Sequence, residues 1–201
     1  MIVRAVQYIY YLLFHALLRV LIRGKCVASD IGKGRPLLLI SNHISRIDPF
    51  MLAILPFRQA FSLMPVYFMT SKDYYDKLWL RIIIQPFGAY PVSTVGVSLD
   101  DILQTTIAKL REGNTVLIFP EGRIVRKGMR PVLKPGLAHI LCKVPVTVVP
   151  VKIEGLDRRW WEIILRGGFS IKVGMPKSYD TLQKEGAAKE AENIVNRLRA
   201  L

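Results

Sequence analysis

Two short segments of the chain contain residue types suited to acid–base chemistry. Residues 42–48 read Asn-His-Ile-Ser-Arg-Ile-Asp, and residues 119–123 read Phe-Pro-Glu-Gly-Arg. On a continuous helix, side chains five residues apart point about 140° away from each other, so His43 and Asp48 meet only if a loop folds His43 back. Asp48 would then fix the tautomer of His43, and the other ring nitrogen would be a general base, typically worth about 10²–10⁴-fold in rate. The spacing alone equally allows a surface histidine and an aspartate that only caps a helix.

Each segment follows a short apolar run that is typical of a buried parallel strand, at Pro36–Ser41 and Thr115–Phe119. In open α/β sheets, ligands bind at the carboxyl ends of such strands. Further strands are expected over 66–69, over 146–153 and, at a sheet edge, over 169–173. Helices are expected over 74–84, 135–142 and 184–201, and from Ser98 to Gly113. Another helix should begin with Asp48 as its N-cap and Pro49 as its first helical residue. We therefore predict an α/β fold: a single domain with a mostly parallel central sheet flanked by helices, plus an N-terminal membrane-associating helix.

The N-terminus is apolar and its flanks are basic. The run Ala5–Ile22 is nearly long enough to cross a bilayer core as a helix, and the first acidic residue of the chain is Asp30. We expect residues 1–25 to form a hydrophobic anchor helix, either spanning the bilayer or lying in its plane, and residues 26–201 to form the domain. The alternative is a helix buried in the core.

Composition restricts the classes of protein further. Hydrophobic residues make up 51%, yet Lys and Arg outnumber Asp and Glu by 29 to 15, which gives a formal net charge of +14. A chain this apolar is not intrinsically disordered, and two cysteines are too few for a disulfide scaffold. The positive charge indicates an anionic partner: nucleic acid, a phospholipid surface or a phosphorylated substrate.

The distribution of the positive charge along the chain indicates which of these anionic partners is expected. No carboxylate lies between Glu121 and Glu154, whereas seven cationic residues do: Arg123, Arg126, Lys127, Arg130, Lys134, Lys143 and Lys152. Their position after the second segment favours phosphate binding over an ordinary solvated face. No nucleic-acid-reading motif accompanies the charge, so nucleic acid is not an expected partner. No His, Cys or carboxylate cluster has metal-site spacing, and neither a metal nor another cofactor is expected.

The two segments belong to an ordered set of motifs. Asn42-His43 with Asp48 is followed by Lys72 and the Pro-Phe-Gly-Ala-Tyr-Pro-Val stretch at 86–92, then by Phe-Pro-Glu-Gly at 119–122 and Val-Pro-Val at 149–151. In this order the motifs resemble those of the 1-acylglycerol-3-phosphate O-acyltransferase (glycerolipid acyltransferase) family, and the resemblance covers roughly Pro36 to Gly155.

The resemblance implies a membrane-associated O-acyltransferase on the cytoplasmic face of the membrane. Its donor would be a thioester, acyl-CoA or acyl carrier protein, and its acceptor the hydroxyl of a lysophospholipid. His43 would deprotonate that hydroxyl and Asp48 would orient His43. The implied substrate-binding residues are Asn42, Lys72, Glu121, Gly122, Arg123 and Pro150, of which Glu121 and Gly122 would contact the glycerol-phosphate and Arg123 would pair with the phosphate.

Two departures from the family pattern bear on the acceptor. The second motif is followed by Val92-Ser93-Thr94, where many members have an arginine that binds the phosphate. Arg123 occupies the place of the usual threonine, as in a branch that reacylates lysophospholipids such as 2-acylglycerophosphoethanolamine. The acceptor is therefore lysophosphatidate or another 1- or 2-acyl glycerophospholipid, and Lys72, Arg126 or Lys127 is a substitute for the missing cation. The alternative function is a catalytically silent lipid- or acyl-carrier-binding protein with the same fold.

Overall fold

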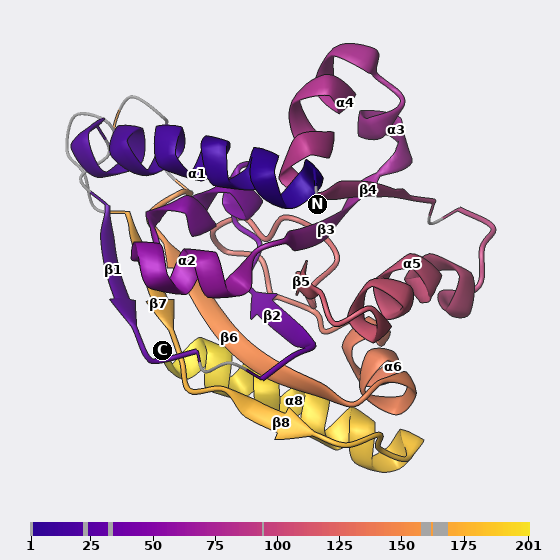
Figure 1. Cartoon of the computed structure of the whole chain (residues 1–201). Coiled ribbons are helices and arrows are strands. Elements are labelled where there is room, and N and C mark those ends of the chain that lie inside the picture. The colour runs from indigo at the N-terminus through magenta and orange to yellow at the C-terminus, as the bar shows by residue number, and fades with distance from the viewer. Residues whose placement is uncertain (1, 22–23, 32–33, 94, 158–161, 163–168) are drawn as a thin grey trace.

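A mixed sheet forms the middle layer of the molecule (Figure 1). The computed structural model describes residues 2–21, 24–31, 34–93, 95–157, 162 and 169–201. Within these residues the sheet has eight strands in the order β1-β7-β6-β2-β5-β3-β4, with β8 paired to β6. Only the pairs β6–β7 and β6–β8 are antiparallel. The strands are β1 (Lys25–Ala28), β2 (Leu37–Ser41), β3 (Val66–Ser71), β4 (Ala89–Val92), β5 (Thr115–Ile118), β6 (Val146–Glu154), β7 (Ser170–Val173) and β8 (Lys177–Tyr179).

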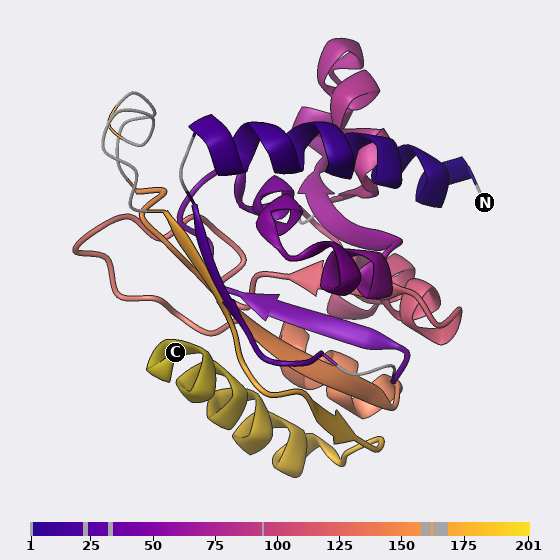
Figure 2. The same cartoon turned by 60° about the vertical axis from the view of Figure 1, so that its left-hand side comes forward.

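Helices cover both faces of the sheet (Figure 2). One face carries α1 (Ile2–Leu21), the 3-10 helix η1 (Asp48–Ile54) and α2 (Phe57–Leu63). The other face carries α5 (Leu99–Arg111), α6 (Gly136–Lys143) and α8 (Lys184–Ala200). Three further short helices, α3 (Lys72–Tyr75), α4 (Leu78–Ile84) and η2 (Gln85–Phe87), connect β3 to β4.

Strand β2 shows why a continuous apolar run forms the centre of this fold. All five of its residues are buried. Leu37 and Leu39 belong to the apolar core on the α1 side, whereas Leu38 and Ile40 belong to the core on the α5 side. Because successive strand side chains point to opposite faces, a strand covered on both sides requires apolar residues at every position. Parallel pairing with β5 and β6 then places the carboxyl ends of all three strands at one edge of the sheet.

Helix α1 is packed onto the domain along one side. Gln7 is buried and its amide exchanges hydrogen bonds with the backbone of Val66, at 2.8 and 2.9 Å. Tyr11 is also buried and donates a 2.6 Å hydrogen bond to the carbonyl of Leu55. The opposite side of the helix leaves large apolar side chains in solvent, at Ile9, Leu12 and Leu13. The helix is therefore amphipathic in its packing: one side contacts the core, and the other side is apolar and exposed.

Among the residues that the structure describes, no helix has both the length and the apolar character needed to cross a bilayer. The division into an anchor over 1–25 and a domain over 26–201 stays a prediction.

The predicted α/β fold with a mostly parallel sheet and flanking helices is confirmed, with three local corrections. Strand β7 is not an edge strand, since β1 pairs outside it. The helix expected over 74–84 is two helices, α3 and α4, separated at Asp76 and Lys77. Asp48 does not act as an N-cap: it is the first residue of η1, and its side chain turns back to the preceding loop.

Candidate active site

The loop after β2 brings His43 and Asp48 into contact. Nδ1 of His43 lies 2.8 Å from Oδ2 of Asp48, whose side chain is fully buried, while the His43 side chain is 20% exposed. A carboxylate oxygen can only accept, so Nδ1 is the donor and Nε2 carries the free lone pair. The spacing allowed this contact or a surface histidine, and the structure shows the contact.

Backbone donors explain why the loop folds this way. The N–H groups of Ile44 and Ser45 each donate a 2.8 Å hydrogen bond to the same Oδ2 atom of Asp48. Three donors therefore converge on one carboxylate oxygen and close the loop over the start of η1. The other oxygen, Oδ1, is buried without a hydrogen-bond partner in the described part of the chain. Such an arrangement holds an imidazole in one tautomer and one orientation.

Glu121 supports the same loop from β5. It is 7% exposed, and its Oε2 accepts a 3.0 Å hydrogen bond from the backbone N–H of His43. Burial raises the pKa of the Glu121 carboxyl, opposed by this hydrogen bond. Two residues before Glu121 in the chain, the ring of Phe119 stacks on the His43 ring with centroids 4.1 Å apart and planes 17° from parallel. The carboxyl group and the ring thus hold the backbone and the side chain of His43.

The neighbouring motif residues also have defined structural positions. The Asn42 side chain makes two 2.8 Å hydrogen bonds to the backbone of Ile153, which join the end of β2 to β6. Gly122 has a φ of +62°, and its N–H donates to the carbonyl of Phe119 in a tight turn. A side chain at this position would be strained, which accounts for glycine after Glu121.

The segment that follows is a basic loop, residues 123–134, which lies beside the same sheet edge. The backbone N–H of Val125 donates a 2.7 Å hydrogen bond to the carbonyl of His43, so the loop is held against the His43 backbone. Arg123, Arg126, Lys127 and Arg130 are exposed. Within the described ranges, none of these four cations forms an ion pair with a carboxylate. The charge of the loop is therefore available to a ligand.

An open polar pocket of about 410 Å³ lies between this loop and the end of β6. Its charged lining residues are Arg126, Lys127, Lys152, Glu154 and Asp157, and Asn42 and Ile44 border it on either side of His43 in the sequence. Lys152 Nζ lies 3.4 Å from Glu154 Oε1, so that lysine is partly neutralised. Arg126 and Lys127 remain the cations that can neutralise a bound anion.

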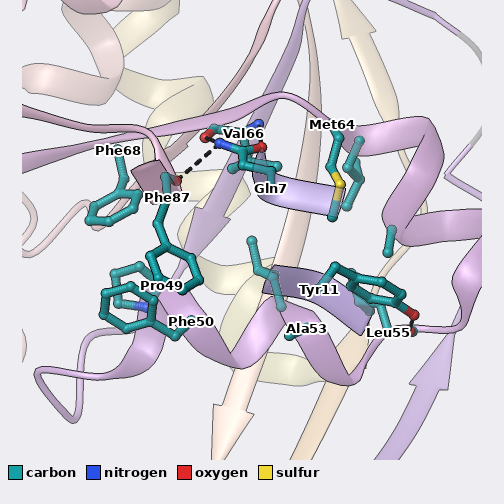
Figure 3. Close-up of a pocket in the computed structure, with 13 residues that line it drawn as sticks. Gln7, Tyr11, Pro49, Phe50, Ala53, Leu55, Met64, Val66, Phe68 and Phe87 are labelled. Carbon is teal, nitrogen blue, oxygen red and sulfur yellow. Dashed lines mark hydrogen bonds between the residues drawn. The ribbon is translucent and has the colours of Figure 1, made fainter. Parts of the chain in front are cut away.

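A second pocket, on the α1 face of the sheet, is apolar (Figure 3). It encloses about 60 Å³ and is lined by α1, η1, α2, β3 and η2. Pro49 and Phe50, the two residues after Asp48, belong to its lining. Figure 3 shows Phe50, Phe68 and Phe87 gathered on one side of it and Tyr11 and Met64 on the other. No charged residue is among its lining residues. The pocket suits a hydrocarbon group beside the His43–Asp48 pair.

Three predicted site residues lie apart from these contacts. Arg123 is exposed at the start of the basic loop and is not among the residues that line either pocket. Lys72 begins α3, and its ammonium group forms no ion pair with the site residues that the structure describes. Pro150 is buried within β6 and pairs with Ile40 of β2, which is a structural position.

The site contacts of four residues, Phe119, Lys152, Glu154 and Asp157, were not evident from the sequence. Phe119 was treated only as part of a motif, and stacking on His43 could not be expected without the register between β2 and β5. Lys152, Glu154 and Asp157 were not singled out as pocket residues, although their place at the end of a predicted strand was a usable signal.

The arrangement suits proton transfer to and from a hydroxyl group at Nε2 of His43. Among the described residues, no three His, Cys, Asp or Glu side chains gather as metal ligands would.

Comparison with known proteins identifies the family of this chain. Residues 21–154 match the family described as Acyltransferase. A curated relative, the 1-acyl-sn-glycerol-3-phosphate acyltransferase of Borreliella burgdorferi, is 23% identical over 174 residues, which are 86% of this chain and 66% of that protein. The chain thus spans just under two thirds of the length of that relative.

A solved structure has the same fold. The crystal structure of the 1-acyl-sn-glycerophosphate (LPA) acyltransferase PlsC from Thermotoga maritima superposes with a TM-score of 0.64 at 18% identity, covering 99% of this chain and 80% of that one.

Proposed function

This chain belongs to the Acyltransferase family, and we propose that it transfers a fatty acyl group from a thioester donor to the hydroxyl of a lysophospholipid. The observation that carries the proposal is the buried Asp48 carboxylate holding Nδ1 of His43 at 2.8 Å, with Glu121 on the His43 backbone. The glycerolipid acyltransferase names of the relative and of the solved structure support the substrate class.

In the proposed reaction, Nε2 of His43 accepts the proton of the acceptor hydroxyl while its oxygen attacks the thioester carbonyl. A C–O bond forms, the C–S bond breaks, and the leaving thiolate takes the proton back from His43. Asp48 stabilises the imidazolium formed in between. Because the acceptor oxygen attacks directly, no covalent acyl-enzyme is needed.

The two pockets receive different parts of the substrates in this proposal. The polar pocket, with Arg126 and Lys127 on its wall, would bind a phosphate group, in the place of the arginine missing after the second motif. The apolar pocket, with Pro49 and Phe50 in its lining, would accept part of an acyl chain. The acceptor in this proposal is lysophosphatidate or another 1- or 2-acyl glycerophospholipid, and the donor is acyl-CoA or acyl carrier protein.

We also propose that the protein works on a phospholipid membrane, at its cytoplasmic face. The support is the exposed apolar side of α1, where Ile9, Leu12 and Leu13 are each more than half exposed, together with the net charge of +14. A helix of this kind lies in the plane of the membrane with its apolar side in the lipid.

The experiment that tests the function is thioester consumption with a panel of lysophospholipids, offered with acyl-CoA and with acyl carrier protein, analysed by lipid mass spectrometry. His43→Ala should lower the rate by about 10²-fold or more, since it removes the general base. His139→Ala is the matched control, because His139 lies on α6 and pairs with Asp100 instead. Thioester binding without turnover on any acceptor would instead indicate the catalytically silent lipid- or carrier-binding protein.

A further inference from the structure

Helix α4 is an apolar helix that no other segment covers among the residues that the structure describes. Its sequence is Leu-Trp-Leu-Arg-Ile-Ile-Ile, and none of its residues is buried. Leu78 is 70% exposed, Trp79 and Ile82 are each 64% exposed, and Ile83 is 50% exposed. Four neighbouring large apolar side chains on a seven-residue helix form a patch that a water-facing surface does not require.

Helix α4 lies near α1 in the fold. In both Figure 1 and Figure 2, α3 and α4 project beyond the sheet at the edge that α1 covers. Helix η2 follows α4 directly and joins it to α1: the ring of Phe87 lies 4.4 Å from that of Tyr10 and 5.6 Å from that of Phe14, centroid to centroid. Helices α1 and α4 are thus neighbours in the fold, connected through η2.

Cations and aromatic rings surround the α4 patch. The guanidinium of Arg46 and the ammonium of Lys77 lie 5.7 and 5.8 Å from the ring centre of Tyr74, and Arg81 lies 5.2 Å from that of Tyr75. Within residues 72–84, three cations outnumber the two carboxylates: the cations are Lys72, Lys77 and Arg81, and the carboxylates are Asp73 and Asp76. Apolar tips bordered by tyrosines and cations match the boundary between the acyl chains and anionic headgroups of a bilayer.

We infer that α3 and α4 form a second membrane-contacting element, in which Leu78, Trp79, Ile82 and Ile83 enter the headgroup–acyl boundary of an anionic phospholipid bilayer beside α1. Arg46 belongs to the loop that holds His43 and Asp48, so its contact with Tyr74 connects this element to the catalytic loop. The bilayer would therefore lie next to the site from which a lysophospholipid is taken. The inference extends the membrane association proposed for α1, and its vesicle test does not depend on acyl transfer.

The test compares two double variants of the full chain in binding to vesicles of equal parts phosphatidylglycerol and phosphatidylcholine. Trp79→Ser with Ile82→Ser should lower the partition coefficient by about tenfold, because two large apolar side chains lose their contact with lipid. Val27→Ser with Met175→Ser is the matched control. These residues are each 69% exposed, on β1 and after β7, at the end of the sheet opposite β4, and their substitution should leave binding unchanged.

A second measurement reads the position of Trp79 without changing α4. Of the three tryptophans, Trp160 and Trp161 are replaced by Phe, so that only Trp79 fluoresces. Phospholipids brominated along the acyl chain should quench Trp79 in vesicles, and its emission should shift to shorter wavelength.

Other outcomes overturn the inference. If Trp79 is not quenched and the Trp79/Ile82 variant binds vesicles as the unsubstituted protein does, α4 does not enter the bilayer. If that variant instead dissociates a dimer, or loses affinity only for acidic acyl carrier protein, the patch binds that partner and not lipid.

An assay of acyl transfer to a water-soluble, short-chain lysophospholipid distinguishes failure of this inference from failure of the proposed function. The Trp79/Ile82 variant should retain this activity, because the assay needs no bilayer. Absence of the activity in the unsubstituted protein would count against the proposed function alone.

Discussion

The two pockets beside the His43–Asp48 pair are built from opposite kinds of residue. The apolar pocket is closed by α1 and η1, encloses about 60 Å³ and has no charged residue in its lining. The polar pocket is open, has a volume of about 410 Å³ and is lined by five charged side chains. Residues 42 and 44 border the polar pocket, residues 49 and 50 border the apolar one, and His43 and Asp48 lie in the loop that joins them.

This difference suggests that the two pockets bind different parts of the substrates on either side of one general base. A substrate with a hydrocarbon part and a phosphate part can place each in a pocket that excludes the other, because an apolar cavity gives no compensation for a desolvated charge. Substitutions in one pocket should then change the enzyme's selectivity for one part of the substrate. Substitutions in the His43 loop should lower the rate with every substrate equally.

The largest effect is expected at the His43–Asp48 pair. Asp48→Asn removes the charge that stabilises the imidazolium and places an amide against three converging donors, so kcat should fall by about 10²–10⁴-fold. The measurement is kcat over a panel of acyl donors and headgroups, with the melting temperature as a check on folding. A loss confined to one headgroup or one chain length would contradict a shared catalytic pair.

A smaller effect is expected in the polar pocket alone. Arg126→Ala with Lys127→Ala should raise KM for phosphate-bearing acceptors by about tenfold, since charge-assisted hydrogen bonds to the phosphate are lost. The dependence of KM on salt should weaken, while the preference among acyl chains stays the same. Arg130→Ala is the control, because Arg130 lies in the same loop and is not among the residues that line the pocket. An equal effect of both variants would mean that only the general positive charge of the loop matters.

Substitution in the apolar pocket should change the preference among acyl chains and leave the KM for the phosphate group unaffected. Ala53→Phe places a ring in this lining, so the ratio of kcat/KM for long over short acyl chains should fall by roughly tenfold or less. Ala53→Ser, of nearly the original size, should preserve the ratio. If the Ala53→Phe variant keeps the same preference among acyl chain lengths, the acyl chain does not bind in this pocket.

The smallest expected effect is on the pH dependence of stability, through Glu121. Burial raises the pKa of this carboxyl above its unfolded value, so the folded protein binds more protons at this position. The resulting stability is fully present below the unfolded pKa and is lost as pH rises through the raised folded pKa. Glu121→Gln does not titrate and keeps an oxygen to accept from the His43 N–H.

Thermal unfolding of the unsubstituted protein and of Glu121→Gln measures this effect. The melting temperature of the unsubstituted protein relative to the variant should fall by a few degrees between about pH 4 and pH 7. A relative rise over the same interval would reverse the sign assigned to the shift.

Much of the fold could be predicted because it rests on local patterns. The runs that become β2 and β5 are apolar at nearly every position, and a strand covered on both faces requires this. The start of α5 was predictable for an equally local reason, since the Ser98 hydroxyl accepts a hydrogen bond from the N–H of Asp101. Strand β1 has no such signature, because it is short, half exposed and formed only by pairing with β7.

The sequence by itself determined which chemistry the chain carries: a histidine, an aspartate and a glutamate at the ends of two buried strands, followed by a basic segment. It left open whether His43 and Asp48 meet, because five residues in sequence correspond to no single distance. The tertiary structure decided this through the N–H groups of Ile44 and Ser45, which turn the loop around one carboxylate oxygen.

The tertiary structure also decided what the two apolar segments do. One face of α1 is buried because β3, η1 and η2 lie beneath it. Within the described part of the chain α4 has no such neighbour, and its apolar side chains are exposed. Hydropathy describes the side chains of a segment, and burial depends on which other segments the fold brings against it.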